Sequence, residues 1–189
     1  MLPGVIVLLA VLGGIILILI IAVIGIYNSM VSLRNTVDNS WHQIDVQLRK
    51  RYDLIPNLVE TVKGYAKHER ETLQNVINAR KLGIDAKDIK SQAKAENMIT
   101  GALKSLFAVS ENYPNLKADQ QFSKLMDQLN GIESNIAFSR QFYNDTVMRF
   151  NTRIQTFPGN MFARIFHFSP RDYFEIEEAS ARGPVKVEF

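Results

Sequence analysis

The chain has no cysteine, and this absence excludes several kinds of protein. Among its 189 residues there is no thiol, so disulfide scaffolds, Cys-ligated zinc, iron–sulfur clusters and thiol catalysis are ruled out. A large excess of one charge sign is missing too, because 22 Lys and Arg are interleaved with 19 Asp and Glu. A net charge of +3 gives little reason to expect a nucleic-acid partner.

Motifs of enzymes and metal sites are also missing. The three histidines, His42, His68 and His167, do not pair at helical spacing, and the sequence has neither an HExxH zinc motif nor a Glu-x-x-His di-metal motif. No phosphate-binding loop occurs, and no serine is singled out as a nucleophile. We therefore expect no catalytic residues, no cofactor and no metal. An enzyme is an alternative that no motif supports.

Charge is absent from the first 33 residues, since Arg34 is the first charged side chain. Residues 5–26 are 22 consecutive apolar or glycine residues, and a helix needs about 20 to cross a bilayer core. A signal peptide is the alternative, but its apolar core is typically only ~7–15 residues long and follows a basic flank. We predict an uncleaved transmembrane anchor over residues 1–27, with Tyr27 at the membrane interface.

The flanks of this anchor bear on its orientation. No Lys or Arg precedes it, whereas Arg34 and the basic residues 49–51 follow it. The positive-inside rule favours a bundle in the cytoplasm over one on the periplasmic or extracellular side of a bacterial inner membrane.

Beyond the anchor, apolar residues recur at the period of an α-helix. Over residues 26–55 they lie three or four positions apart, a mean of about 3.6, with no intervening proline or glycine. One helix is expected to continue from the membrane and to end at Pro56. Further helices are expected over about 57–82, capped by Gly83, then from about 92 to 113 and from about 117 to 157. The prediction is an all-α fold whose N-terminal transmembrane helix is continuous with an antiparallel bundle of four long helices.

The segment at residues 47–68, QLRKRYDLIPNLVETVKGYAKH, resembles the LemA family of bacterial membrane proteins. The similarity extends upstream through YNSMVSLRNTVDNSWHQIDVQ and downstream through IAFSRQFYNDTVMRFNTRIQTFPGN to DYFEIEEASARGPVKVEF, so it covers nearly the whole chain. It implies an N-terminal anchor, long helices and no established enzymatic activity. Association also suggests other envelope proteins as partners, such as TPM-domain proteins or membrane metalloproteases.

Some members of that family are lipoproteins whose bundle lies outside the cytoplasm. In this chain Gly25 and Ile26 stand where those relatives have their lipid-bearing cysteine, so lipid attachment is not implied. The topology of those relatives opposes the orientation that the flanking charges favour.

Two groups of residues are candidates for a functional site. Arg51, Asp53 and Asn57 surround Pro56 in the signature of the family, and their simplest role is to cap the two helix ends expected there. Partner binding is the alternative role.

The second candidate is residues 161–168, MFARIFHF, which a returning last helix would bring near the bilayer. Together with Tyr27, the membrane-interface candidates are Phe162, Arg164 and Phe166. A cap over the end of the bundle core is the alternative.

The predicted domains are the anchor at 1–27, a bundle at 28–168 and a C-terminal tail at 169–189. This tail is expected either to be flexible or to lie along a neighbouring copy.

These features favour a non-enzymatic, membrane-anchored helical scaffold or adaptor of the bacterial envelope. Its expected partners are the lipid bilayer, further copies of the chain and other envelope proteins. Ala10 and Gly14 allow close packing of the membrane helix. The alternative is a lipid-binding or membrane-remodelling module that acts through the bundle and residues 161–168.

Overall fold

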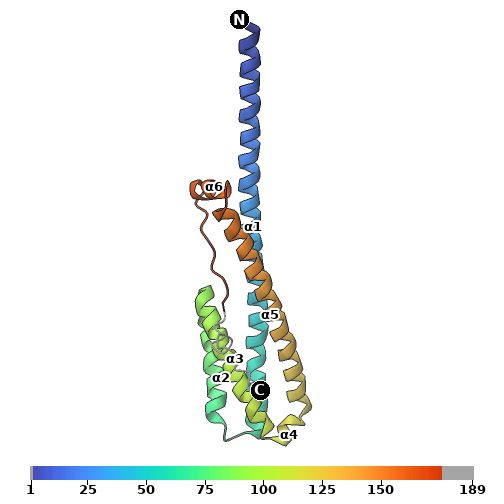
Figure 1. The fold of residues 1–189 in the computed structure, drawn as a ribbon. Coiled ribbons are helices and arrows are strands. Elements are labelled where there is room, and N and C mark those ends of the chain that lie inside the picture. The colour runs from blue at the N-terminus through green and yellow to red at the C-terminus, as the bar shows by residue number, and fades with distance from the viewer. Residues whose placement is uncertain (1, 176–189) are drawn as a thin grey trace, which may run out of the picture. The chain divides into compact units, whose positions relative to one another are not determined.

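The computed structural model describes residues 2–175, and over that stretch the chain consists of helices and their connections (Figure 1). No strand occurs between residues 2 and 175. The helices are α1 (Leu2–Tyr65), α2 (Arg70–Asp85), α3 (Ile89–Glu111), α4 (Pro114–Lys117), α5 (Gln120–Gln155) and α6 (Gly159–Ile165). The all-α fold class is confirmed. The predicted continuity of the N-terminal transmembrane helix with the first helix of the bundle is also confirmed, because both lie in α1.

The chain forms two compact units, which we call the span unit and the bundle unit. The span unit comprises Met1–Trp41 and Phe142–Arg171, and the bundle unit comprises His42–Gln141 and Asp172–Phe189. Both α1 and α5 contribute residues to each unit. The predicted tail lies outside the described residues from position 176 onward.

The span unit begins with the segment predicted to cross the membrane. Within the described residues, α1 is the one helix long and apolar enough to do so. Apart from the half-buried Val23, its large apolar side chains between Ile6 and Ile24 are 46–67% exposed, so the rest of the described chain leaves them uncovered. A helix surrounded by lipid has this character, because its backbone is satisfied internally and its side chains face hydrocarbon.

After the span, α1 packs against the last turns of α5. The buried apolar residues here are Met30 and Val37 of α1 and Tyr143, Val147, Phe150 and Ile154 of α5. The ring of Trp41 meets that of Tyr143 edge to face, with centroids 5.6 Å apart. Met30 and Val37 lie on the apolar stripe predicted over residues 26–55, so the 3.6-residue period identified the packed face of α1 correctly.

The bundle unit contains the remainder of α1 and α5 together with α2, α3 and α4. Its buried core residues include Ile44, Leu48, Tyr52 and Ile55 of α1, Leu73 and Val76 of α2, Ile99, Leu103 and Leu106 of α3, and Leu125, Leu129 and Ile136 of α5. They recur every three or four positions on each helix, as an amphipathic bundle helix requires.

The prediction that Pro56 ends a helix is wrong, because α1 passes through Pro56 and ends at Tyr65. Proline has no N–H, so the carbonyl of Tyr52 loses its usual donor four residues on. Arg80 replaces that donor, since its Nε lies 2.7 Å from the Tyr52 carbonyl oxygen. The chain instead turns at residues 66–69, two residues after Gly64.

The prediction that Gly83 caps a helix is also wrong. Gly83 is buried inside α2, which continues to Asp85. A Cβ added to Gly83 would lie 2.6 Å from the Tyr52 hydroxyl oxygen, so the glycine lets α2 approach α1 closely. The expected loop over 83–91 shrinks accordingly. Asp88 caps α3 through a reciprocal capping box with Ser91, which the sequence reading missed.

The chain after α5 is held in place up to the last described residues. In the span unit, Asn151 accepts a hydrogen bond from the Arg171 backbone N–H at 2.8 Å and donates one to its carbonyl at 2.9 Å. In the bundle unit, Phe174 is only 1% exposed, and the Arg140 guanidinium lies 5.3 Å from its ring centroid. The described part of the predicted tail is therefore attached through Arg171 and Phe174, although its other residues are exposed.

Candidate functional site

A charged cluster lies inside the bundle unit, centred on Arg51. The Arg51 side chain is 2% exposed and pairs with two carboxylates. Its Nη1 lies 2.6 Å from Oε2 of Glu96 on α3, and its Nη2 lies 2.6 Å from Oε1 of Glu133 on α5. Nη2 also donates to the Thr100 hydroxyl at 3.1 Å. One guanidinium therefore joins three helices.

The second half of this cluster is Tyr52, the neighbour of Arg51 on α1. Its hydroxyl donates to Oε1 of Glu96 and accepts a hydrogen bond from the Gln92 amide at 2.6 Å. Both oxygens of Glu96 are thus engaged by α1. Because a buried carboxylate without partners is strongly unfavourable, these contacts offset the cost of burying Glu96, whose side chain is 2% exposed.

Burial in the cluster raises the pKa of two of its groups, Tyr52 and Glu133. Burial, with Glu96 beside it, raises the pKa of Tyr52 far above its ordinary value, so this hydroxyl stays protonated. Burial also raises the pKa of Glu133, a rise that Glu96 supports and that Arg51 and Arg140 oppose. The carboxylates and hydroxyl face one another and the guanidinium, so the arrangement holds α1, α3 and α5 in register.

Of the predicted turn residues, only Arg51 belongs to this cluster. Asp53, Pro56 and Asn57 are exposed, and no helix ends beside them, so the capping role is wrong. The sequence reading also missed Tyr52, Glu96 and Glu133 as partners. A signal was present, because Arg51 lies between Leu48 and Ile55 on the apolar stripe, and a charge there needs a buried partner.

The other candidate group forms an aromatic collar in the span unit, made of Tyr27, Phe150, Phe166 and Phe168. Tyr27 contacts Phe166 and Phe168 edge to face, with centroids 4.8 and 6.0 Å away. Phe150 lies 6.3 Å from Phe168. These contacts attach the segment around α6 to α1 directly after the apolar span (Figure 1).

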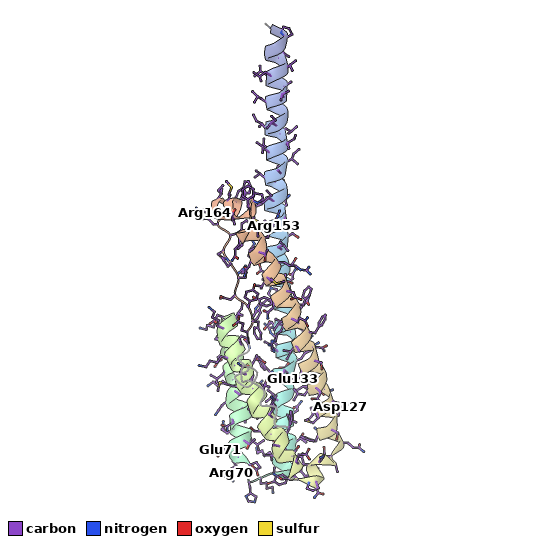
Figure 2. All side chains as sticks on the ribbon, viewed as in Figure 1. Arg70, Glu71, Asp127, Glu133, Arg153 and Arg164 are labelled. Atoms are coloured by element: carbon purple, nitrogen blue, oxygen red, sulfur yellow. The ribbon has the colours of Figure 1, made fainter. Side chains whose placement is uncertain are left out.

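The predicted interface residues take different places around this collar. Tyr27 and Phe166 are about two-fifths exposed, at 39% and 41%, Phe162 is half-buried and Arg164 is exposed. Figure 2 shows Arg164 on α6 and Arg153 near the end of α5.

The outer face of α6 is apolar and uncovered, which the sequence reading did not specify. Met161 and Ile165 lie four residues apart on this helix and are 56% and 63% exposed, and Phe157, in the connection before it, is 79% exposed. Gly159 and Ala163 on the other face are buried, and a Cβ added to Gly159 would meet the Arg153 carbonyl oxygen and Met30. This short helix thus has one face packed on the unit and another available to lipid or protein.

The histidines add no site. His42, His68 and His167 are exposed, and the described residues contain no group of three or more side chains suited to a metal ion. His167 has φ 57°, because it follows α6 in a Schellman cap closed by the Phe168 N–H on the Ala163 carbonyl at 2.9 Å.

An exposed apolar anchor helix, a helical bundle and an aromatic collar at the end of the span define a membrane-associated, all-helical protein. Sequence comparison places it more narrowly. The chain belongs to the LemA family, whose profile matches residues 40–189.

Relatives with assigned names support both the family and the membrane association. The chain is 25% identical to magnetosome protein MamQ 2 of Paramagnetospirillum magneticum over 81% of this chain and 66% of the relative. It is 25% identical to protein LemA of Metamycoplasma hominis over 75% of this chain and 65% of the relative. MamQ of Magnetospirillum gryphiswaldense is 22% identical over 81% and 66%. The chain therefore spans just under two thirds of the length of these relatives.

Proposed function

We propose that this protein is a membrane-anchored helical scaffold of the bacterial envelope that acts without catalysis. The observation that carries the proposal is α1, a single helix from Leu2 to Tyr65. Its first part is apolar and exposed, and its later part holds the buried Arg51 cluster. One helix thus provides both the anchor and the centre of the bundle.

Self-association is part of this proposal. In the span, Gly13 and Gly14 have open space where a Cβ would stand, so a second helix can approach closely beside Ala10. On the bundle unit Phe138 is 72% exposed, and a large uncovered aromatic ring suits a protein contact. Further copies and other envelope proteins are the partners we propose.

The proposed orientation places the bundle in the cytoplasm. No basic side chain precedes the span, and Arg34 follows it. The basic residues Arg153 and Arg164 add to this side, because they belong to the span unit. Protease access in intact spheroplasts tests the orientation, since digestion of the bundle from outside would contradict it.

The test of the scaffold is the mass of the full chain in mild detergent and in nanodiscs. We expect an oligomer whose size persists on dilution, and cross-links between single cysteines placed in the span of neighbouring copies. A monomer at high protein concentration in both settings would refute self-association. Ala10→Cys reports on the proposed contact while keeping Gly13 and Gly14, and Leu19→Cys is its matched control on another part of the span.

A second candidate function is membrane remodelling, which the outer face of α6 favours. An apolar face at the end of a span inserts shallowly into one leaflet. The test is vesicle shape after reconstitution of the full chain, with Met161→Asp and Ile165→Asp as variants. Narrow tubules with the unaltered chain and spherical vesicles with the variants would support remodelling. If the vesicles with the unaltered chain and with the variants have the same shape, α6 serves only as part of the anchor.

A further inference from the structure

The net positive charge of this protein lies in the span unit. Residues 1–41 and 142–171 contain five arginines, two aspartates and no lysine or glutamate, a formal charge of +3. The whole chain also has a net charge of +3, so the residues of the bundle unit balance to zero. The arginines are Arg34, Arg149, Arg153, Arg164 and Arg171. The entire excess therefore belongs to the unit that contains the membrane span.

Three of these arginines border the aromatic collar or α6 without an acidic partner. Arg34 lies over the Phe168 ring, with its Cζ 5.4 Å from the centroid. Arg164 belongs to α6 (Figure 2), and Arg153 is half-buried with an Nε that finds no hydrogen-bond acceptor. Among the described residues these three form no ion pair.

The acidic side chains of the same unit do not neutralise them. Asp38 is engaged by Arg171, whose Nη2 lies 3.0 Å from its Oδ1. Asp145 is exposed on α5, more than a full helical turn from Arg153. Within residues 2–175, the guanidinium groups around the collar are thus open to a further anion.

The place of these arginines along α1 matches the headgroup layer. Arg34 follows Ile26 by eight residues, about 12 Å of helix, and headgroups extend some 5–8 Å beyond the hydrocarbon on each side. An arginine side chain can bridge the remaining distance by extending toward the surface. The contact of Tyr27 with Phe166 keeps Arg164 and α6 near the same level.

We propose that the span unit binds the phosphates of anionic phospholipids through Arg34, Arg153 and Arg164. Guanidinium groups fit phosphate oxygens through paired hydrogen bonds, and they remain charged at any physiological pH. The apolar face of α6 lies among the upper acyl chains beside them. This inference rests on the proposed membrane position of α6, and it adds the class of lipid that the unit selects.

The test uses the full chain in phosphatidylcholine vesicles that contain a trace of spin-labelled phosphatidylglycerol or spin-labelled phosphatidylcholine. The lipid spectra give the association constant of each lipid relative to the bulk. We expect phosphatidylglycerol to associate more strongly, with about fivefold lost for each arginine that contacts it. Replacing Arg34, Arg153 and Arg164 together by Gln should remove the preference.

A matched control replaces three exposed lysines of the bundle unit, Lys50, Lys104 and Lys124, by Gln. This variant has the same total charge as the arginine variant, so its lipid preference should stay at the level of the unaltered chain. Equal association of the two lipids with the unaltered chain, or equal losses in both variants, would overturn the inference.

A separate readout distinguishes this failure from failure of the proposed function. A spin label at Ile165→Cys reports whether α6 is in the membrane surface, in vesicles of phosphatidylcholine alone. A label at the surface without a lipid preference overturns only the anionic selectivity. A label fully accessible to water-soluble quenchers overturns the membrane position of α6, and the lipid inference with it.

Discussion

Arg51→Met removes the guanidinium that joins α1, α3 and α5, and its effect can be worked out from the contacts. Glu96, at 2% exposure, would keep the hydroxyl of Tyr52 and the amide of Gln92 but lose the cation that pairs with it among the described residues. Glu133, at 37%, can turn toward water. The cost is therefore mainly one uncompensated buried carboxylate, about 3–5 kcal/mol.

This free energy corresponds to a large change in thermal stability. For domains between about 60 and 250 residues, each kcal/mol shifts Tm by roughly 2–8 °C, so Arg51→Met should lower Tm by at least about 6 °C. The assay is thermal unfolding of the full chain in detergent, followed by circular dichroism at 222 nm. Arg49→Met is the matched control, because Arg49 is 74% exposed and pairs only with Asp45. Its expected effect is below about 1 kcal/mol.

A double variant separates the charge from the loss of packing. Glu96→Gln removes the stranded carboxylate while keeping a partner for the Tyr52 hydroxyl. When it is combined with Arg51→Met, it should restore a substantial part of the lost stability. The coupling free energy between the two substitutions should exceed about 1 kcal/mol. The reasoning is refuted if Arg51→Met behaves like Arg49→Met, or if Glu96→Gln adds its own loss to that of Arg51→Met.

Three further predictions concern the bundle unit. Gly83→Ala should destabilise it by about 1–3 kcal/mol because its Cβ has no room, whereas Gly131→Ala, with open space, should stabilise α5 by up to ~1 kcal/mol. Arg80→Met should cost about 1–3 kcal/mol by leaving a buried carbonyl without a donor, and Pro56→Ala should restore that donor from the backbone. The raised pKa of Glu133 means that the folded state binds a proton more readily. The stability this gives is fully present below the ordinary glutamate pKa and is lost as pH rises through the raised pKa.

Chemical denaturation of the full chain checks all three. Equal changes in stability for Gly83→Ala and Gly131→Ala would contradict the close approach of α2 to α1. For the proline, an unchanged loss in the Arg80→Met and Pro56→Ala double variant would contradict the carbonyl account. For the pH dependence, Glu133→Gln should flatten the stability profile over the window above the ordinary glutamate pKa. An unaltered profile in that variant would exclude Glu133 as its source.

The sequence predicts the helices and their packed faces well, because burial follows a 3.6-residue period. Met30, Val37, Ile44 and Leu48 all lie on the predicted stripe and are buried. The helix ends were predicted less well. Local propensity places a break at Pro56, but Arg80 donates a tertiary hydrogen bond to the carbonyl of Tyr52, 28 positions away from it in the sequence, and so replaces the donor that the proline lacks. Single-residue signals cannot reveal a donor that arrives from another helix.

The candidate sites show the same division between local and tertiary information. Tyr27 and Phe166 were both identified from the sequence as interface residues. Their contact, which attaches the collar to α1, was not predicted, because the two residues are far apart in the sequence. The Arg51 cluster was hidden because its charges look like solvated ones until their places on the apolar stripes are considered. Glu96 lies three residues before Ile99 on such a stripe, and only the fold shows which cation it faces.

The central claim is that α1 anchors the chain in a bilayer whose surface α6 touches, with the bundle outside the lipid. Because the chain has no cysteine, single labels at Ile16→Cys, Ile165→Cys and Met98→Cys can each report depth in nanodiscs by oxygen and nickel-chelate accessibility. The account predicts a label deep in the hydrocarbon at position 16, one at the headgroup boundary at 165 and one in water at 98. Full water accessibility at position 16 or 165 would contradict it.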